Sequence, residues 1–152
     1  MWPFRRRQQE LTPSVLDGQW SIGEVESDGR RMIVRKNQGA ARLVGDARFP
    51  IRVGVAVPFH HPDGSGMPAP DEFTRLAAIE DDLVELFQAG RQAVAALSIT
   101  TAGMREFVFY AADASWAEGV LQDARSRVSD YELQSYVSPD PTWDVYSQFR
   151  FK

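Results

Sequence analysis

The sequence predicts an α+β domain whose core elements follow the order strand, helix, strand, strand, helix, strand. Two segments, residues 51–58 and 104–112, are rich in β-branched or aromatic side chains and lie next to turn-forming residues, as strands do. Two other segments, residues 71–89 and 115–128, repeat apolar side chains at helical spacing. A hairpin precedes this series, and a short aromatic segment follows it.

The chain divides into a tail and one domain. Residues 1–17 are expected to be a flexible tail, because terminal segments are commonly poorly ordered. Residues 18–152 are expected to form a single α+β domain, since a chain of about this length can bury roughly 70% of its unfolded surface. In this domain the first strands surround Asp28 and Gly29, a dipeptide that suits the positive φ angles of a tight hairpin turn.

The strand at residues 51–58 has one bulky face and one nearly bare face. Its apolar Ile and Val side chains share one face, whereas Arg52, Gly54 and Ala56 share the other, because side chains alternate along a strand. A strand with so little bulk lets a ligand or another part of the chain approach closely. The loop that follows, residues 58–70, is rich in Pro and Gly and borders this face.

The predicted helix at residues 71–89 carries one carboxylate within its apolar stripe. Asp71 is expected to cap the first turn, where backbone N–H groups lack partners. Glu80 lies at helical spacing from the apolar residues of the stripe. Because an unpaired buried charge is costly, Glu80 is expected to reach the edge of the core or to pair with Arg52 or Arg105.

Two further strands, a helix and a last strand complete the core. The strands are predicted at residues 92–101 and 104–112, and the last strand at residues 131–138. The helix between them begins near Ser115, which has the capping-box spacing with Glu118. This order of elements is the split βαβ arrangement (βαββαβ) of ferredoxin-like domains, in which both helices lie on one face of an antiparallel sheet.

The strand at residues 104–112 has bulky side chains on both faces. Phe107 and Phe109 point to one face, and Val108 and Tyr110 point to the other. The helices cover only one face in the predicted fold, so the N-terminal hairpin or the C-terminal segment 141–151 must cover the other. An Asp-Pro pair favours a short helix at the start of that segment, whereas the alternation of its aromatic residues leaves a strand open.

Composition excludes several classes of chemistry. The chain has no Cys, which removes disulfides, thiolate catalysis and Cys-ligated metal sites. It has 21 acidic and 17 basic residues, a net charge of −4 that argues against nucleic acid as a partner. No apolar run is long enough to span a membrane, and no secretory signal is evident, so a cytoplasmic protein is expected.

Four segments together resemble DUF695, a family of domains of unknown function. They are FPIRVGVAVP, AIEDDL, ITTAGMREFVFY and DPTWDVYSQF, and the resemblance extends from about Trp20 to Phe149. It implies a bacterial protein, and in some bacterial proteins such a domain is joined to a type-B regulator of ribonuclease E activity. It implies no catalytic residue, because the family has no agreed activity.

No catalytic residue, cofactor or metal site is expected. The only two histidines, His60 and His61, are adjacent in a loop, a position that seldom presents both rings to one metal. Guanidinium groups are suited to anchor a carboxylate or a phosphate, and Trp, Tyr and Arg dominate binding hot spots. The candidate binding or interaction surface therefore consists of Arg52, His60, Glu80, Arg105, Tyr110, Trp143 and Tyr146.

Two functions remain open. The first is a non-enzymatic protein-interaction or regulatory module with a protein partner. The alternative is a small-molecule-binding protein or an undescribed enzyme that uses the loop at residues 58–70 and the sheet face near Gly54. A concave pocket with convergent Arg and Glu would favour the alternative, and a filled sheet face with an exposed apolar patch would favour the first. Sheet edges in the predicted fold are compatible with a monomer or a homodimer.

Overall fold

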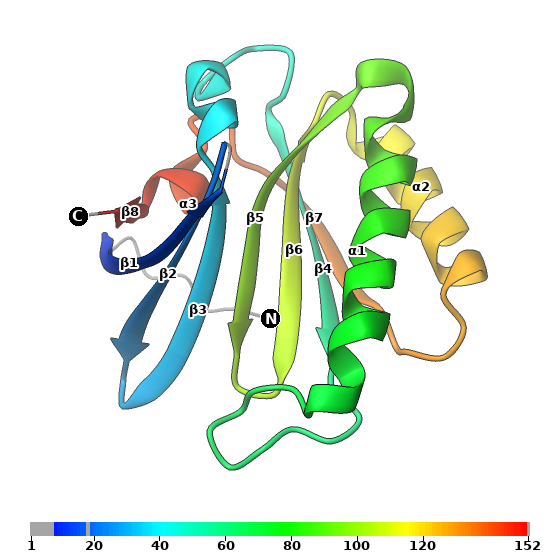
Figure 1. Cartoon of the computed structure of the whole chain (residues 1–152). Helices are drawn as coiled ribbons and strands as arrows, with labels where there is room; N and C mark the ends of the chain where they lie inside the picture. The colour runs from blue at the N-terminus through cyan, green and yellow to red at the C-terminus, as the bar shows by residue number, and fades with distance from the viewer. Residues whose placement is uncertain (1–7, 18, 152) are drawn as a thin grey trace.

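In the computed structural model, which describes residues 8–17 and 19–151, eight strands form one sheet with helical segments on both faces (Figure 1). The strand order is β7-β4-β6-β5-β3-β2-β1-β8, and all neighbouring strands are antiparallel except β1 and β8. The strands are β1 (Gln9–Asp17), β2 (Trp20–Ser27), β3 (Arg30–Asn37), β4 (Ile51–Pro58), β5 (Ala93–Thr101), β6 (Met104–Ala111), β7 (Gln134–Pro139) and β8 (Phe149–Phe151). The helices are α1 (Phe73–Gln88), α2 (Ala114–Arg127) and α3 (Asp144–Ser147), with 3-10 segments η1 (Gln38–Leu43), η2 (Pro70–Glu72) and η3 (Ala89–Arg91).

The helices α1 and α2 cover one face of the strands β7, β4, β6 and β5 (Figure 1). The valines of β4 and the two phenylalanines of β6 supply the sheet side of this core, and in each strand they share one face, as their alternation predicted. Phe87 of α1 stacks on Phe109 of β6 with ring centres 4.4 Å apart. The predicted α+β class is thus confirmed, and the sheet is larger than the four strands expected for the core.

The C-terminal segment covers the second face of the sheet. Val108 and Tyr110 of β6 are buried there in a second core. Their cover includes Trp143, Val145, Tyr146 and Phe149. The segment forms both structures left open by the sequence, since α3 is followed by β8, which pairs in parallel with β1. The N-terminal hairpin instead widens the sheet, because β3 pairs with β5 along the edge.

The predicted tail needs correction over residues Gln9–Asp17, which form β1. This strand pairs with β2 and β8, and its Leu11 is fully buried. Pro13 lies within the strand, and the register shifts between Pro13 and Val15. A bulge of this kind interrupts alternation, so the sequence lacked the period of two that marks a strand. Residues 1–7 of the predicted tail lie outside the described residues.

The hairpin turn forms at the residues that the sequence predicted, whereas both helix caps are formed by other residues. Asp28 and Gly29 both have positive φ angles, 53° and 75°, as the hairpin prediction required. The cap of α2 is Asp113 rather than Ser115, because the Asp113 carboxylate accepts the Trp116 backbone N–H at 2.8 Å. Asp71 does not cap α1, since it lies within η2 and the N-cap position belongs to the next residue.

Gly54→Ala is expected to destabilise the protein by about 1–3 kcal/mol, the usual cost of overpacking a core. A Cβ at Gly54 would overlap the ring of Tyr136, which crosses β4 from β7. The matched control is Gly119→Ala in α2, where a Cβ meets no atom within 4 Å and where Ala is favoured over Gly by about 0.5–1 kcal/mol. Urea unfolding of both variants measures the effects, and equal stability of Gly54→Ala and the unmodified protein would contradict the expectation.

Candidate functional site

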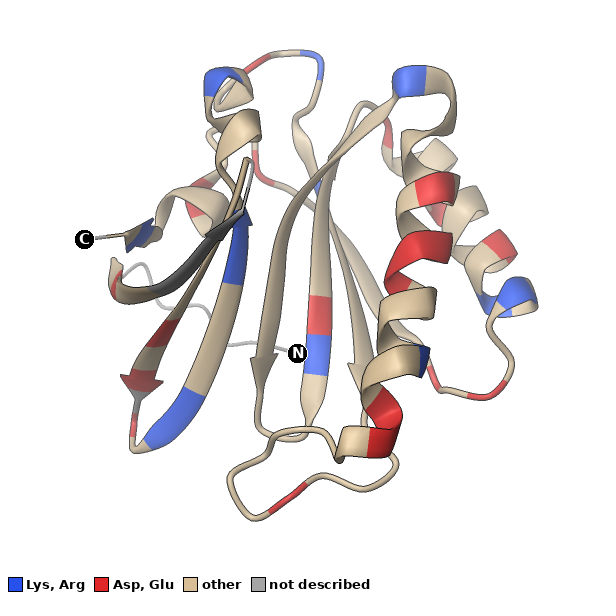
Figure 2. Cartoon of the chain, viewed as in Figure 1, with Lys and Arg blue, Asp and Glu red and all other residues tan. Residues whose placement is uncertain are grey.

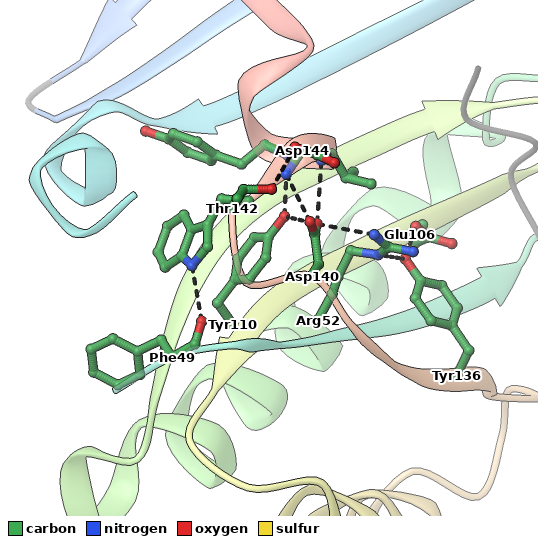
Figure 3. A network of polar contacts seen from close by, with 11 residues as sticks. Phe49, Arg52, Glu106, Tyr110, Tyr136, Asp140, Thr142 and Asp144 are labelled. Carbon is green, nitrogen blue, oxygen red and sulfur yellow. Dashed lines mark hydrogen bonds and ion pairs between the residues drawn. The ribbon is translucent and has the colours of Figure 1, made fainter. Parts of the chain in front are cut away.

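The structure distributes the seven predicted surface residues over three places. Arg52, Tyr110, Trp143 and Tyr146 lie on the sheet face opposite α1 and α2, within a polar network (Figure 3). Glu80 and Arg105 lie together between α1 and the β2–β3 hairpin. His60 lies in the loop that precedes α1. The predicted residues therefore do not form one common surface.

Asp140 is the centre of the polar network in Figure 3. Its carboxylate accepts hydrogen bonds from the Tyr110 hydroxyl at 2.7 Å and from the Arg52 guanidinium at 3.0 Å. It also accepts the backbone N–H groups of Asp144 at 2.8 Å and Val145 at 3.3 Å, at the start of α3. One buried carboxylate thus joins β4, β6 and the C-terminal segment.

Trp143 and Tyr146 are anchored in the interior. Trp143 has a left-handed backbone with φ 57°, and its ring stacks on Tyr110 at a centroid distance of 4.0 Å. Its indole N–H donates to the Phe49 carbonyl at 2.9 Å. The Tyr146 hydroxyl donates to the Asn37 carbonyl at 2.7 Å. These aromatic side chains hold the C-terminal segment against the sheet.

Arg52 continues the network toward a buried carboxyl, that of Glu106. The Tyr136 hydroxyl accepts the Nε–H of Arg52 at 3.2 Å and lies 3.2 Å from Glu106 Oε2. Glu106 is fully buried, and its Oε1 has no hydrogen-bond partner among the described residues. Burial raises the pKa of Glu106 to about 8, so its neutral form is favoured at pH 7. The Tyr136 ring fills the space over Gly54.

Glu80 pairs with Arg35 of β3 rather than with Arg52 or Arg105. Both carboxylate oxygens of Glu80 accept Arg35 Nη1, at 2.7 and 2.9 Å. The Arg35 guanidinium lies 5.1 Å from the ring centre of Trp20 on β2. This interaction brings α1 against the hairpin through residues that are 45 positions apart in the chain.

Arg105 lies beside this pair and is half-buried. Its Nε–H donates to the Thr100 hydroxyl at 2.8 Å. Burial lowers the pKa of Arg105, the negative charge of Glu80 raises it, and the positive charge of Arg35 lowers it. Three charged groups therefore share one site between the helix and the hairpin.

His60 belongs to a loop that is fixed by Glu72. The Glu72 carboxylate accepts the backbone N–H groups of His60 at 2.7 Å and His61 at 3.1 Å. It also accepts the Tyr131 hydroxyl at 2.7 Å, and the His60 ring stacks on Tyr131 with centres 3.8 Å apart. Within residues 8–17 and 19–151, no group of three His, Asp or Glu side chains is arranged to hold a metal ion.

Several residues of these sites were not predicted to take part in them. Asp140 and Tyr136 organise the network around Arg52, and Arg35 is the actual partner of Glu80. The bare face at Gly54 was a usable signal for Tyr136, because a small residue on a strand indicates close approach by another group. No local pattern marked Arg35, which alternates as an ordinary polar residue of the hairpin.

Tyr110→Phe is expected to lower the free energy of unfolding by about 1–3 kcal/mol, the cost of leaving buried polar groups without partners. The variant removes the hydroxyl that donates to Asp140 and accepts the Tyr146 backbone N–H at 3.2 Å. Chemical denaturation measures the loss, and hydrogen exchange of the Tyr146 amide should become faster. An unchanged unfolding midpoint would show that the hydroxyl is not needed to hold the C-terminal segment.

Glu106→Gln is expected to change the pH dependence of stability. The native state retains a proton on Glu106 up to about pH 8, whereas the unfolded chain releases it near the ordinary value of 4.5. The free energy of unfolding of the unmodified protein should therefore fall relative to the variant between pH 4.5 and 8, by at most about 1.4 kcal/mol per pH unit. Urea unfolding at pH 5, 6, 7 and 8 measures the difference, with the exposed Glu118→Gln as control. If the free energy of unfolding changes with pH in the same way for Glu106→Gln and for the unmodified protein, this prediction is wrong.

Comparison with known protein families gives a match to this chain. The model of DUF695, a family of unknown function, matches residues 18–151. No curated protein and no solved structure gave a significant match. The link to regulation of ribonuclease E is not supported by these comparisons. Because the family model covers almost the whole chain, the protein belongs to the DUF695 family.

Proposed function

We propose that the protein is a non-enzymatic interaction module that binds a partner protein between α1 and the β2–β3 hairpin. The observation that carries this proposal is the exposure of Phe73, whose residue surface is 51% accessible. In the described part of the chain, Val44 is the only other large apolar residue exposed to a comparable degree. We name this region the α1–hairpin surface, and it consists of Trp20, Ile33, Arg35, Phe73, Glu80 and Arg105.

The hairpin contributes to this surface through the face that it shares with α1. Ile33 pairs with Thr100, which in turn pairs with Arg105, so these three residues lie on one face of the sheet. Arg35 is two residues from Ile33 and reaches Glu80 on α1, which identifies the face as the α1 side. Ile33 and Arg35 are both half-buried.

The helix contributes through one flank of α1. Phe73, Ala77 and Glu80 are spaced by four and three residues, so they follow one another along the same side of the helix. The hydrogen bonds of Glu80 to Arg35 turn this side toward the hairpin. Phe73 and Ala77 are exposed, which leaves an apolar strip beside the charged pair.

The chemistry of this surface supports recognition of a protein. Aromatic residues and Arg are enriched where binding energy concentrates in interfaces, and Phe73, Trp20 and two arginines meet these criteria. Figure 2 shows acidic positions along α1, basic positions on β3, and a basic position next to an acidic one on β6. Through Arg35, Glu80 and Arg105, charges of both signs belong to this surface. Mixed surfaces of this kind favour specific orientation of a partner.

The alternative function has less geometric support. Small-molecule binding was expected to use the bare face near Gly54 and the loop at residues 58–70. Tyr136 fills the space over Gly54, and Glu72 fixes the start of the loop. The sheet face is therefore filled, while apolar surface is exposed on α1, which is the combination that favours an interaction module.

The same proposal includes a ferredoxin-like core for this module. The strand order β7-β4-β6-β5, its antiparallel pairing and the placement of α1 and α2 on one face support it. Strand β3 continues this unit on the β5 side. In this proposal, the α1–hairpin surface is built beside that core.

Phe73→Glu is expected to reduce capture of the partner at least tenfold, because it places a charge in the apolar part of the contact. The measurement is a tagged pull-down from native lysate, quantified by mass spectrometry against an unrelated tagged protein. Val44→Glu is the matched control, since Val44 is 40% exposed and lies after η1, outside the α1–hairpin surface. Thermal unfolding establishes that both variants fold.

The proposal is refuted if no protein is captured stoichiometrically. It is also refuted if Phe73→Glu and Val44→Glu retain the same partner equally, because the contact would then lie elsewhere on the molecule.

A further inference from the structure

The α1–hairpin surface holds more positive than negative charge. Arg35 and Arg105 carry two positive charges, and Glu80 carries one negative charge. Both oxygens of Glu80 are bound to Nη1 of Arg35. Among the described residues, no carboxylate forms an ion pair with Arg105. One positive charge at this site is therefore left without a bonded counterion.

Hydrogen-bond donors are left over at the same place. A guanidinium has five N–H donors, and Arg105 uses the one on Nε for the Thr100 hydroxyl. Within the part of the chain that the structure describes, its four Nη–H donors have no protein acceptor. The two terminal nitrogens of a guanidinium form a fork that matches the two oxygens of a carboxylate.

The Nε atom of Arg105 is held by the fold itself. Arg105 belongs to β6, and its Nε–H donates to the hydroxyl of Thr100 on the paired strand β5. Thr100 is itself only 4% exposed. A side chain already held in one conformation loses little entropy on binding. Burial and the nearby charge of Arg35 both disfavour the charged form of Arg105, and the negative charge of a bound anion would offset these effects.

We infer that Arg105, with Arg35 beside it, binds one carboxylate supplied by an Asp or Glu side chain of the partner protein. The excess of a single positive charge is complementary to a carboxylate, whereas a phosphate group carries about −1.5 to −2 at neutral pH. Ile33 and Phe73 of the same α1–hairpin surface would provide apolar contacts for the residues that flank the acidic side chain. This inference rests on the proposed function and names the chemistry of the partner.

The first experiment tests the carboxylate position directly by NMR of the ¹⁵N-labelled protein. Acetate, inorganic phosphate and chloride are added at matched ionic strength, and the Arg105 Nε–Hε and Thr100 amide signals are followed. Acetate is expected to shift both signals saturably and to bind more tightly than phosphate. Arg105→Gln should weaken the acetate effect on the Thr100 amide at least tenfold, whereas Arg42→Gln, the same charge change at an exposed position, should leave it unchanged.

Arg105→Lys is the second variant, because it keeps the positive charge and removes the fork. It should bind acetate more weakly than the unmodified protein, and it remains informative if Arg105→Gln does not fold. The inference is overturned if chloride reproduces the acetate shifts, or if phosphate binds more tightly than acetate.

The second experiment separates this inference from the proposed function. Arg105→Gln or Arg105→Lys is used in the pull-down beside Phe73→Glu, and at least tenfold lower capture by the Arg105 variant supports the inference. If Phe73→Glu loses the partner and the Arg105 variant retains it, the interaction function stands and the inference falls. If acetate binds at Arg105 but no protein is captured, the interaction function falls, and with it the partner side chain as the source of the carboxylate.

Discussion

Hydrogen bonding to the buried Asp140 carboxylate is the interaction on which the cover of the second sheet face depends. Tyr110 from β6, Arg52 from β4 and two backbone N–H groups at the start of α3 all donate to it. Burying a carboxylate is costly unless hydrogen bonds and a charge replace its water, and these four donors meet that requirement. The result is a C-terminal segment held over a sheet face that α1 and α2 do not cover.

Closure of that face determines where surface is available for binding. Arg52, Tyr110 and Trp143 are used internally, so their chemistry stabilises the fold. On the other face, α1 and α2 pack on β7, β4, β6 and β5, whereas the sheet continues through β3 and β2. A sheet wider than its helical layer leaves a junction where helix, hairpin and strand side chains meet. The Arg35–Glu80 pair lies at this junction.

Local patterns in the sequence predicted the elements better than the contacts between them. Alternation in residues 51–58 and the Asp28-Gly29 pair specify a strand and a turn within a few residues, and both are present. The strand β1 escaped prediction because Pro13 and a register shift interrupt its alternation. The partners of Arg52 and Glu80 lie 88 and 45 residues away, and such pairings follow from topology rather than from spacing.

Arg52 and Arg105 place the same residue type in two different environments of one sheet. Arg52 is paired with a buried carboxylate, and its side chain is only 19% exposed, so its charge is compensated within the fold. Arg105 is desolvated as well, yet its hydrogen bond goes to a neutral hydroxyl and the adjacent carboxylate is bound to Arg35. The fold has already removed part of the water around Arg105. Binding of a carboxylate would therefore spend less free energy on desolvating this guanidinium. A charge that the fold leaves uncompensated at an accessible junction is thereby available for recognition.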